Sequence, residues 1–133
     1  MVLDFSSLKN SILSLEKAII RSQKDPKDEE VRDAVIQRFE YTFELAWKML
    51  RRKLKTDFPS SSEIDALDYK DLIREGAKNG FIKDPQAWFE YRIARNKTSH
   101  NYQESVAKEV YNAAIKFHSD VAFLLSTLES KNK

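Results

Sequence analysis

The chain has 133 residues, a length that fits one domain. Lys and Arg total 23 against 21 Asp and Glu, and this formal net charge of +2 does not by itself identify a nucleic-acid-binding protein. Eight Phe, five Tyr and two Trp supply apolar area for a core, whereas two Gly and three Pro are too few for the turns of a β-rich fold. Since cysteine is absent, disulfides, thiolate metal sites and thiol nucleophiles are excluded.

The amino-terminal residues contain no basic stretch followed by an apolar one, so we do not expect a signal peptide. No apolar run approaches the roughly 20 residues that a membrane-spanning helix needs. We therefore expect a soluble, cytoplasmic protein that makes no membrane contact.

Two long amphipathic helices are predicted in the first half of the chain. The first covers about residues 4–24, with Asp4 as a candidate N-cap and Asp25 before Pro26 as its end. The second covers about residues 28–57, with acidic residues in its first turn and basic residues near its end. One helical row consists of Val31, Val35, Phe39, Thr42, Ala46, Met49 and Lys53, and the apolar face is widened by Ile36, Phe43, Leu50 and Leu54.

Three further helices are predicted in the second half. A short one covers about residues 68–78 and ends before Gly80. The next begins with Asp84 as N-cap and Pro85 at the first helical position. A last long helix covers about residues 104–128 and carries a continuous apolar row.

Together these segments predict an all-α fold, an up-and-down antiparallel bundle of about five helices that forms a single domain over residues 1–133. Residues 58–62 are expected to be a loop. The aromatic residues of the second helix need not all fit one core stripe, so we expect a homodimer. These residues are Phe39, Tyr41, Phe43 and Trp47.

Most catalytic signatures are missing from the sequence. It contains no Gly-rich phosphate loop, no His-Glu-x-x-His and no Gly-x-Ser-x-Gly motif. With two His and no tight carboxylate cluster, neither a metal nor a cofactor is expected. Glu40 and Glu44 are four positions apart, which is typical of a solvated helix face, and a functional role is the alternative. His118, without partners nearby in sequence, is interpreted as a structural or surface histidine.

Residues 92–102 concentrate guanidinium, amine, hydroxyl, amide, imidazole and phenol groups in one short stretch. RNA cleavage can use such a set without a metal. The imidazole of His100 can move a proton to or from a ribose 2′-hydroxyl, and the guanidinium of Arg95 can hold the scissile phosphate. The alternative is that these groups form only a hydrogen-bond network between helices.

Helical geometry constrains this hypothesis. At about 100° per residue, Arg95 and Tyr102 fall nearly in line, whereas His100 lies about 140° from Arg95. Either the helix ends before His100 or the two side chains meet across a dimer interface. Residues 98–101 are poor helix formers, which favours an end there.

Three parts of the sequence resemble known proteins. Arg95, His100 and Tyr102 form an Arg-x4-His-x-Tyr pattern, which resembles the motif of HEPN (higher eukaryotes and prokaryotes nucleotide-binding) domains. Residues 37–48 resemble the second-helix signature of the nucleotidyltransferase substrate-binding protein family. Residues 73–76, with the later Gly80, Phe81, Ile82 and Trp88, are also similar to that family. The likeness covers nearly the whole chain.

The resemblance implies a bundle that dimerises with its two motifs facing each other, and a minimal nucleotidyltransferase encoded alongside. It also implies a toxin–antitoxin pair in which the HEPN member is a metal-independent endoribonuclease, silenced when the partner transfers AMP to a tyrosine. On this basis Arg95 would bind phosphate, His100 would transfer protons, Asn96 would support the site and Tyr102 would be modified. The alternative is a non-catalytic subunit that presents substrate to the nucleotidyltransferase.

Overall fold

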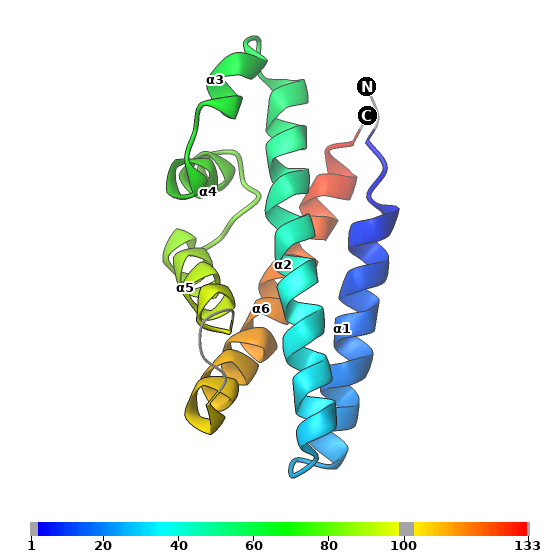
Figure 1. Cartoon of the computed structure of the whole chain (residues 1–133). Coiled ribbons are helices and arrows are strands. Elements are labelled where there is room, and N and C mark those ends of the chain that lie inside the picture. Colours follow the sequence, from blue (N-terminus) through cyan, green and yellow to red (C-terminus); the bar gives the residue numbers. More distant parts are fainter. Residues whose placement is uncertain (1–2, 99–102, 133) are drawn as a thin grey trace.

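The computed structural model describes residues 3–98 and 103–132. Within these ranges it contains six α-helices and no strand. They are α1 (Ser6–Lys24), α2 (Glu29–Asp57), α3 (Ser61–Asp65), α4 (Tyr69–Lys78), α5 (Pro85–Lys97) and α6 (Glu104–Ser130). Helices α1 and α2 run antiparallel side by side, α6 crosses α2 at an angle, and α3 to α5 follow one another along the other side of α2 (Figure 1). The all-α prediction is confirmed.

The number of helices is the main correction to the predicted fold. Helix α3 begins inside the segment that the sequence predicted as a loop, so the described part of the chain has six helices rather than five. Five residues are too few for a helical apolar repeat to appear, and only Ile64 of α3 is buried. The other five helices lie close to their predicted ranges.

Aspartates begin three of the helices, and of these Asp84 was predicted as an N-cap. Asp28, Asp68 and Asp84 each accept a hydrogen bond from a backbone N–H in the first turn of the following helix. Helix α1 differs, because its N-cap residue is Phe5, and the Asp4 carboxylate accepts from the first helical N–H at 2.9 Å. The Asp84 cap matters most here, since it fixes the start of α5.

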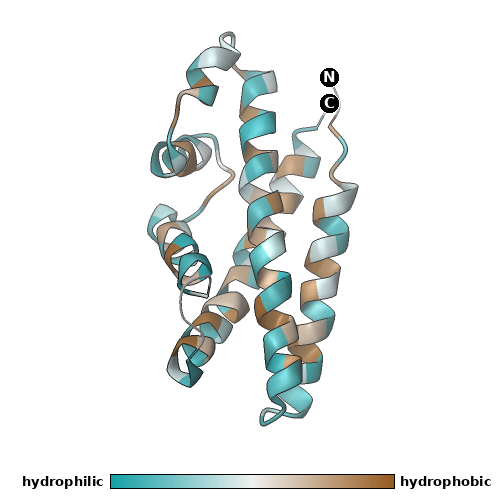
Figure 2. Cartoon of the chain, viewed as in Figure 1, coloured by the Kyte–Doolittle hydropathy of each residue, from teal (hydrophilic) through white to brown (hydrophobic). Residues whose placement is uncertain are grey.

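The centre of the core is a cluster of rings around Phe117 of α6, whose side chain is fully buried. Its ring centroid lies 5.2 to 6.1 Å from those of Phe39, Phe43, Trp88 and Tyr91. These rings come from α2, α5 and α6, so the cluster fixes α5 against the two long helices. The teal and brown turns along α1 and α2 in Figure 2 reflect the amphipathic pattern read from the sequence.

The second helix distributes its aromatic residues as expected. Phe39 and Phe43 are buried, whereas Tyr41 is 40% exposed and Trp47 is half-buried. Lys53, the last residue of the predicted helical row, is buried, and its Nζ donates to the backbone carbonyl of Lys131 at 2.8 Å. No helix within the described ranges has the length and apolar content to cross a membrane.

Candidate functional site

The predicted catalytic stretch starts in the last turn of α5. Arg95 and Asn96 lie in that turn, the helix ends at Lys97, and Thr98 is its C-cap residue. The helix therefore ends before His100, as the poor helix formers in this stretch indicated. His100 and Tyr102 lie outside the described residues.

Two carboxylates of α2 hold the Arg95 side chain, which is 28% exposed. The Nη1 atom of Arg95 lies 3.7 Å from Oε2 of Glu40, and its Nε atom lies 3.5 Å from Oε1 of Glu44. Within the described ranges Nε makes no hydrogen bond. The guanidinium is therefore oriented by charge, and the part of the side chain that stays exposed is accessible to a further anion.

Glu40 also fixes the end of α5. The Thr98 hydroxyl lies 3.1 Å from Oε2 of Glu40 and 3.0 Å from the backbone carbonyl oxygen of Arg95, both in hydrogen-bonding geometry. One carboxylate thus contacts both the guanidinium and the residue after the helix. Glu40 and Glu44 are partly exposed, at 30% and 35%, and both face the Arg95 guanidinium.

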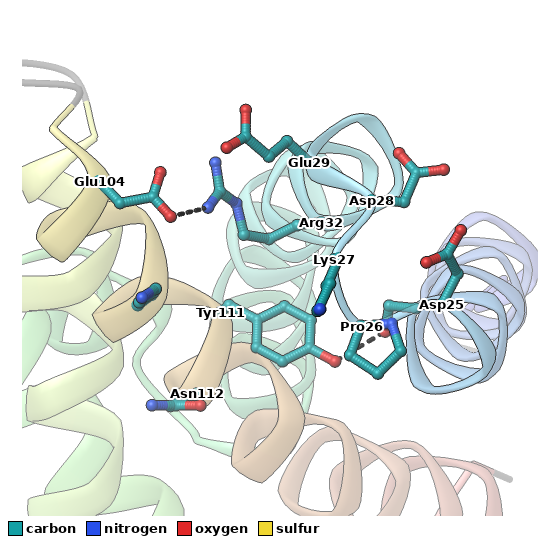
Figure 3. A pocket seen from close by; sticks show the side chains of 11 residues that line it. Asp25, Pro26, Lys27, Asp28, Glu29, Arg32, Glu104, Tyr111 and Asn112 are labelled. Carbon is teal, nitrogen blue, oxygen red and sulfur yellow. Dashed lines mark hydrogen bonds and ion pairs between the residues drawn. The ribbon is translucent and has the colours of Figure 1, made fainter.

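Ion pairs stabilise the described residues that flank positions 99–102. On the preceding side, Nζ of Lys97 lies 2.5 Å from Oε1 of Glu109 in α6. On the following side, Nη1 of Arg32 donates to Oε1 of Glu104, the first residue of α6, at 2.8 Å. Figure 3 shows this second pair at the rim of a cavity of about 450 Å³, where the α1–α2 connection faces α6.

The pairing between α2 and α5 could not be read from the sequence. The spacing of Glu40 and Glu44 places both on one helix face, but which helix faces them depends on how α2 and α5 pack. His118 contacts α1, where its Nε2 lies 3.5 Å from Oε2 of Glu16, in agreement with a structural role. No group of three or more potential metal ligands occurs in the described ranges.

Two tyrosines, Tyr69 of α4 and Tyr91 of α5, are buried and hydrogen-bonded. The Tyr69 hydroxyl donates to the Trp88 carbonyl oxygen at 2.9 Å, and the Tyr91 hydroxyl donates to the Asp120 carboxylate. Burial raises the pKa of Tyr69 well above its usual value. Burial, together with the hydrogen bond to Asp120, raises the pKa of Tyr91 in the same way. Both phenols remain protonated at any physiological pH.

These pKa shifts predict a loss of stability at high pH. Above about pH 10 a tyrosine ionises in the unfolded chain, whereas Tyr91 keeps its proton in the folded state, so the unfolded state is favoured. The free energy of unfolding should then fall by about 1.4 kcal/mol per pH unit for each such group. Urea titrations should show a shallower fall for Tyr91→Phe than for the parent. Exposed Tyr41 provides the control, since Tyr41→Phe should retain the parent slope; an unchanged slope for Tyr91→Phe would contradict this.

Comparison with known proteins places the chain in a family. Residues 3–130 match the family model described as nucleotidyltransferase substrate binding protein like. The chain is 34% identical to a Haemophilus influenzae protein named probable ribonuclease HepT, over 98% of this chain and 95% of that protein. A solved Haemophilus influenzae structure, described as the fold of a substrate-binding domain of a nucleotidyltransferase, is 31% identical over 95% of this chain and 99% of that one, with a TM-score of 0.88.

A second solved structure, from Thermus thermophilus, is 25% identical over 91% of this chain and 98% of that one, with a TM-score of 0.75. The likeness to these relatives extends over nearly the full length of each, so it concerns the whole fold and not one motif. This chain belongs to the nucleotidyltransferase substrate-binding protein family.

Proposed function

We propose that this protein is the HEPN component of a two-protein system with a minimal nucleotidyltransferase, and that it is a metal-independent endoribonuclease. The observation that carries the proposal is the position of Arg95, whose guanidinium is held by Glu40 and Glu44 while its side chain remains 28% exposed. It lies at the end of α5, five positions before His100. The similarity to a protein named probable ribonuclease HepT supports the same assignment.

In the proposed reaction the RNA supplies its own nucleophile. The imidazole of His100 removes the proton of a ribose 2′-hydroxyl, and the 2′-oxygen attacks the adjacent phosphorus. The bond from phosphorus to the 5′-oxygen breaks, which leaves a 2′,3′-cyclic phosphate and a 5′-hydroxyl that takes up a proton. Arg95 binds the phosphate and stabilises its growing negative charge. In a homodimer with facing motifs, the second copy's His100, in its protonated form, is suited to supply that proton.

The proposed silencing of the nuclease takes place at Tyr102, which lies two residues after His100 in the sequence. We propose that its phenol oxygen attacks the α-phosphorus of ATP in the partner's active site, with pyrophosphate as the leaving group. The product is a bulky anionic phosphodiester on the tyrosine. Such a group would compete with RNA phosphate for Arg95.

Growth of expressing bacteria tests both parts of this proposal. Expression of the parent is expected to arrest growth, and His100→Ala to relieve the arrest, because proton transfer is lost. Co-expression of the nucleotidyltransferase should also relieve it, and intact mass should show one added AMP. With the partner present, Tyr102→Phe should remain toxic, since it offers no acceptor oxygen.

Two variants serve as controls in that experiment. His118→Ala changes the other histidine and should remain toxic, whereas Tyr111→Phe should still be silenced by the partner. Growth arrest by His100→Ala would argue against the nuclease. Silencing of Tyr102→Phe would argue against AMP transfer to that residue.

A non-catalytic substrate-binding subunit is the second candidate. It is favoured by the similar Haemophilus influenzae structure, which is described as a substrate-binding domain of a nucleotidyltransferase. On this alternative the protein would form a stable complex with the nucleotidyltransferase, but the purified, unmodified chain would leave RNA intact and expression would not slow growth.

A further inference from the structure

A cavity of about 300 Å³ adjoins the Arg95 site between α2, α4 and α5. Its lining includes Glu44, Trp47, Tyr69, Arg92 and Asn96. The volume lies at the lower end of the range for small-molecule sites, about 300–1,000 Å³. Glu44 belongs to both places, because the same carboxylate lies 3.5 Å from Nε of Arg95. A ligand in this cavity would therefore be next to a phosphate bound by Arg95.

Flat groups make up much of the cavity wall. The half-buried Trp47 indole is perpendicular to the Tyr69 ring, with centroids 6.2 Å apart and an interplanar angle of 89°. The guanidinium of Arg92 lies 4.9 Å from the Tyr69 ring centroid. Indole rings and guanidinium planes are the surfaces on which unpaired RNA bases stack.

The hydrogen-bonding groups that line the cavity differ in whether their donors and acceptors are already used within the protein. Tyr69 has its hydroxyl committed to the Trp88 carbonyl oxygen, and Arg51 donates to the carbonyl oxygens of Ile64 and Leu67 at 2.7 and 3.1 Å. Glu44, by contrast, is partly exposed: its Oε1 lies 3.5 Å from Nε of Arg95 and its Oε2 lies 4.0 Å from Nζ of the exposed Lys48, and each carboxylate oxygen has a further lone pair that can accept. The cavity therefore presents an ionised acceptor beside stacking surfaces.

A carboxylate discriminates among bases because it can accept hydrogen bonds but cannot donate them. Guanine presents two adjacent N–H donors on its Watson–Crick edge, which match the two oxygens of Glu44. Uracil presents one N–H between two carbonyl oxygens, which the carboxylate repels. The charge on Glu44 thus favours guanine over uracil.

We propose that this cavity binds an unpaired guanine base of the RNA, stacked against Trp47 and Arg92 and hydrogen-bonded to Glu44. The inference rests on the proposed nuclease function for the class of its ligand. It adds a base preference next to the cleavage site, and apart from Asn96 the residues that line the cavity lie outside the Arg-x4-His motif.

Binding of two labelled RNAs to the cleavage-deficient His100→Ala protein tests this site. Both are uridine oligomers of about eight nucleotides, and one carries a single central guanosine. The guanosine oligomer is expected to bind more tightly and to quench tryptophan fluorescence, since Trp47 is half-buried whereas Trp88 is buried. In the same background Trp47→Leu should weaken its binding by about 5- to 100-fold. Glu44→Gln should reduce the preference for guanosine, because an amide can both donate and accept.

Matched controls separate the cavity from general effects on the fold. Tyr41→Leu removes an exposed ring of the same helix, and Glu63→Gln removes a charge on α3; both should retain the parent preference. Where Trp47→Leu lowers the melting temperature, Trp47→Phe provides a conservative variant with a smaller stacking loss.

The outcomes distinguish this proposal from the nuclease assignment. Equal affinity for the two oligomers, or a guanosine preference unaffected by a folded Trp47→Leu protein, would overturn the base site even if the parent cleaves RNA. A preference that depends on Trp47 and Glu44, in a protein that does not cleave RNA, would retain the base site and reject the nuclease.

Discussion

Replacement of Arg95 by alanine is expected to lower the rate of RNA cleavage by about a hundred- to a thousandfold, the usual cost of one donor that stabilises transition-state charge. The loss has two parts. The phosphate loses its guanidinium, and the carboxylates of Glu40 and Glu44 lose the charge of Arg95 that offsets their own, so they repel the substrate. Single-turnover cleavage of a defined RNA measures the effect.

Two further variants test whether the effect is specific to the guanidinium of Arg95. Arg95→Lys keeps the charge but loses the planar set of donors, so its rate should lie between those of the parent and the alanine variant. Arg74→Ala removes an exposed arginine of α4, which pairs with Asp71, and should cleave at the parent rate. A folded Arg95→Ala protein with the parent rate would contradict the assigned role.

Phe117→Ala should have the largest effect on stability, a loss of about 3–5 kcal/mol in the free energy of unfolding. The ring is fully buried and contacts aromatic residues of both α2 and α5, so its removal leaves a cavity at the centre of the core. Because this cluster fixes α5 against α2, cleavage should fall together with stability. Urea denaturation, followed by fluorescence, measures the first effect.

The matched control lies on the same helix. Phe123 is half-buried, and its ring faces Nζ of Lys83 at 4.3 Å from the centroid. Phe123→Ala should therefore cost clearly less than Phe117→Ala and leave the Arg95 site intact. Equal losses for the two variants would contradict the central place given to Phe117.

Much of the fold could be predicted because its signals are local. Asp84 and Pro85 define the start of α5 through capping and a fixed backbone angle, and the buried row of α2 follows the helical spacing seen in the sequence. Helix α3 gave no such signal, since one buried residue, Ile64, does not make a period. The short helix was therefore missed.

The candidate site, like the fold, has one part that local sequence signals predict and another part that depends on tertiary packing. Arg95 was identified by its place in a polar stretch, which is local information. Its partners Glu40 and Glu44 lie on another helix, more than fifty positions earlier in the chain, and their pairing depends on how α2 and α5 pack. The cavity lined by Trp47 and Arg92 also combines separate helices, so no spacing in the sequence could reveal it.

Cleavage of total RNA by the purified, unmodified protein in EDTA tests the central claim most directly. Intact mass should first establish that Tyr102 carries no AMP. The account predicts cleavage by the parent and by His118→Ala, products that end in a 2′,3′-cyclic phosphate, and no cleavage by His100→Ala. Intact RNA after incubation with the unmodified parent would contradict the nuclease assignment and leave the substrate-binding subunit as the function.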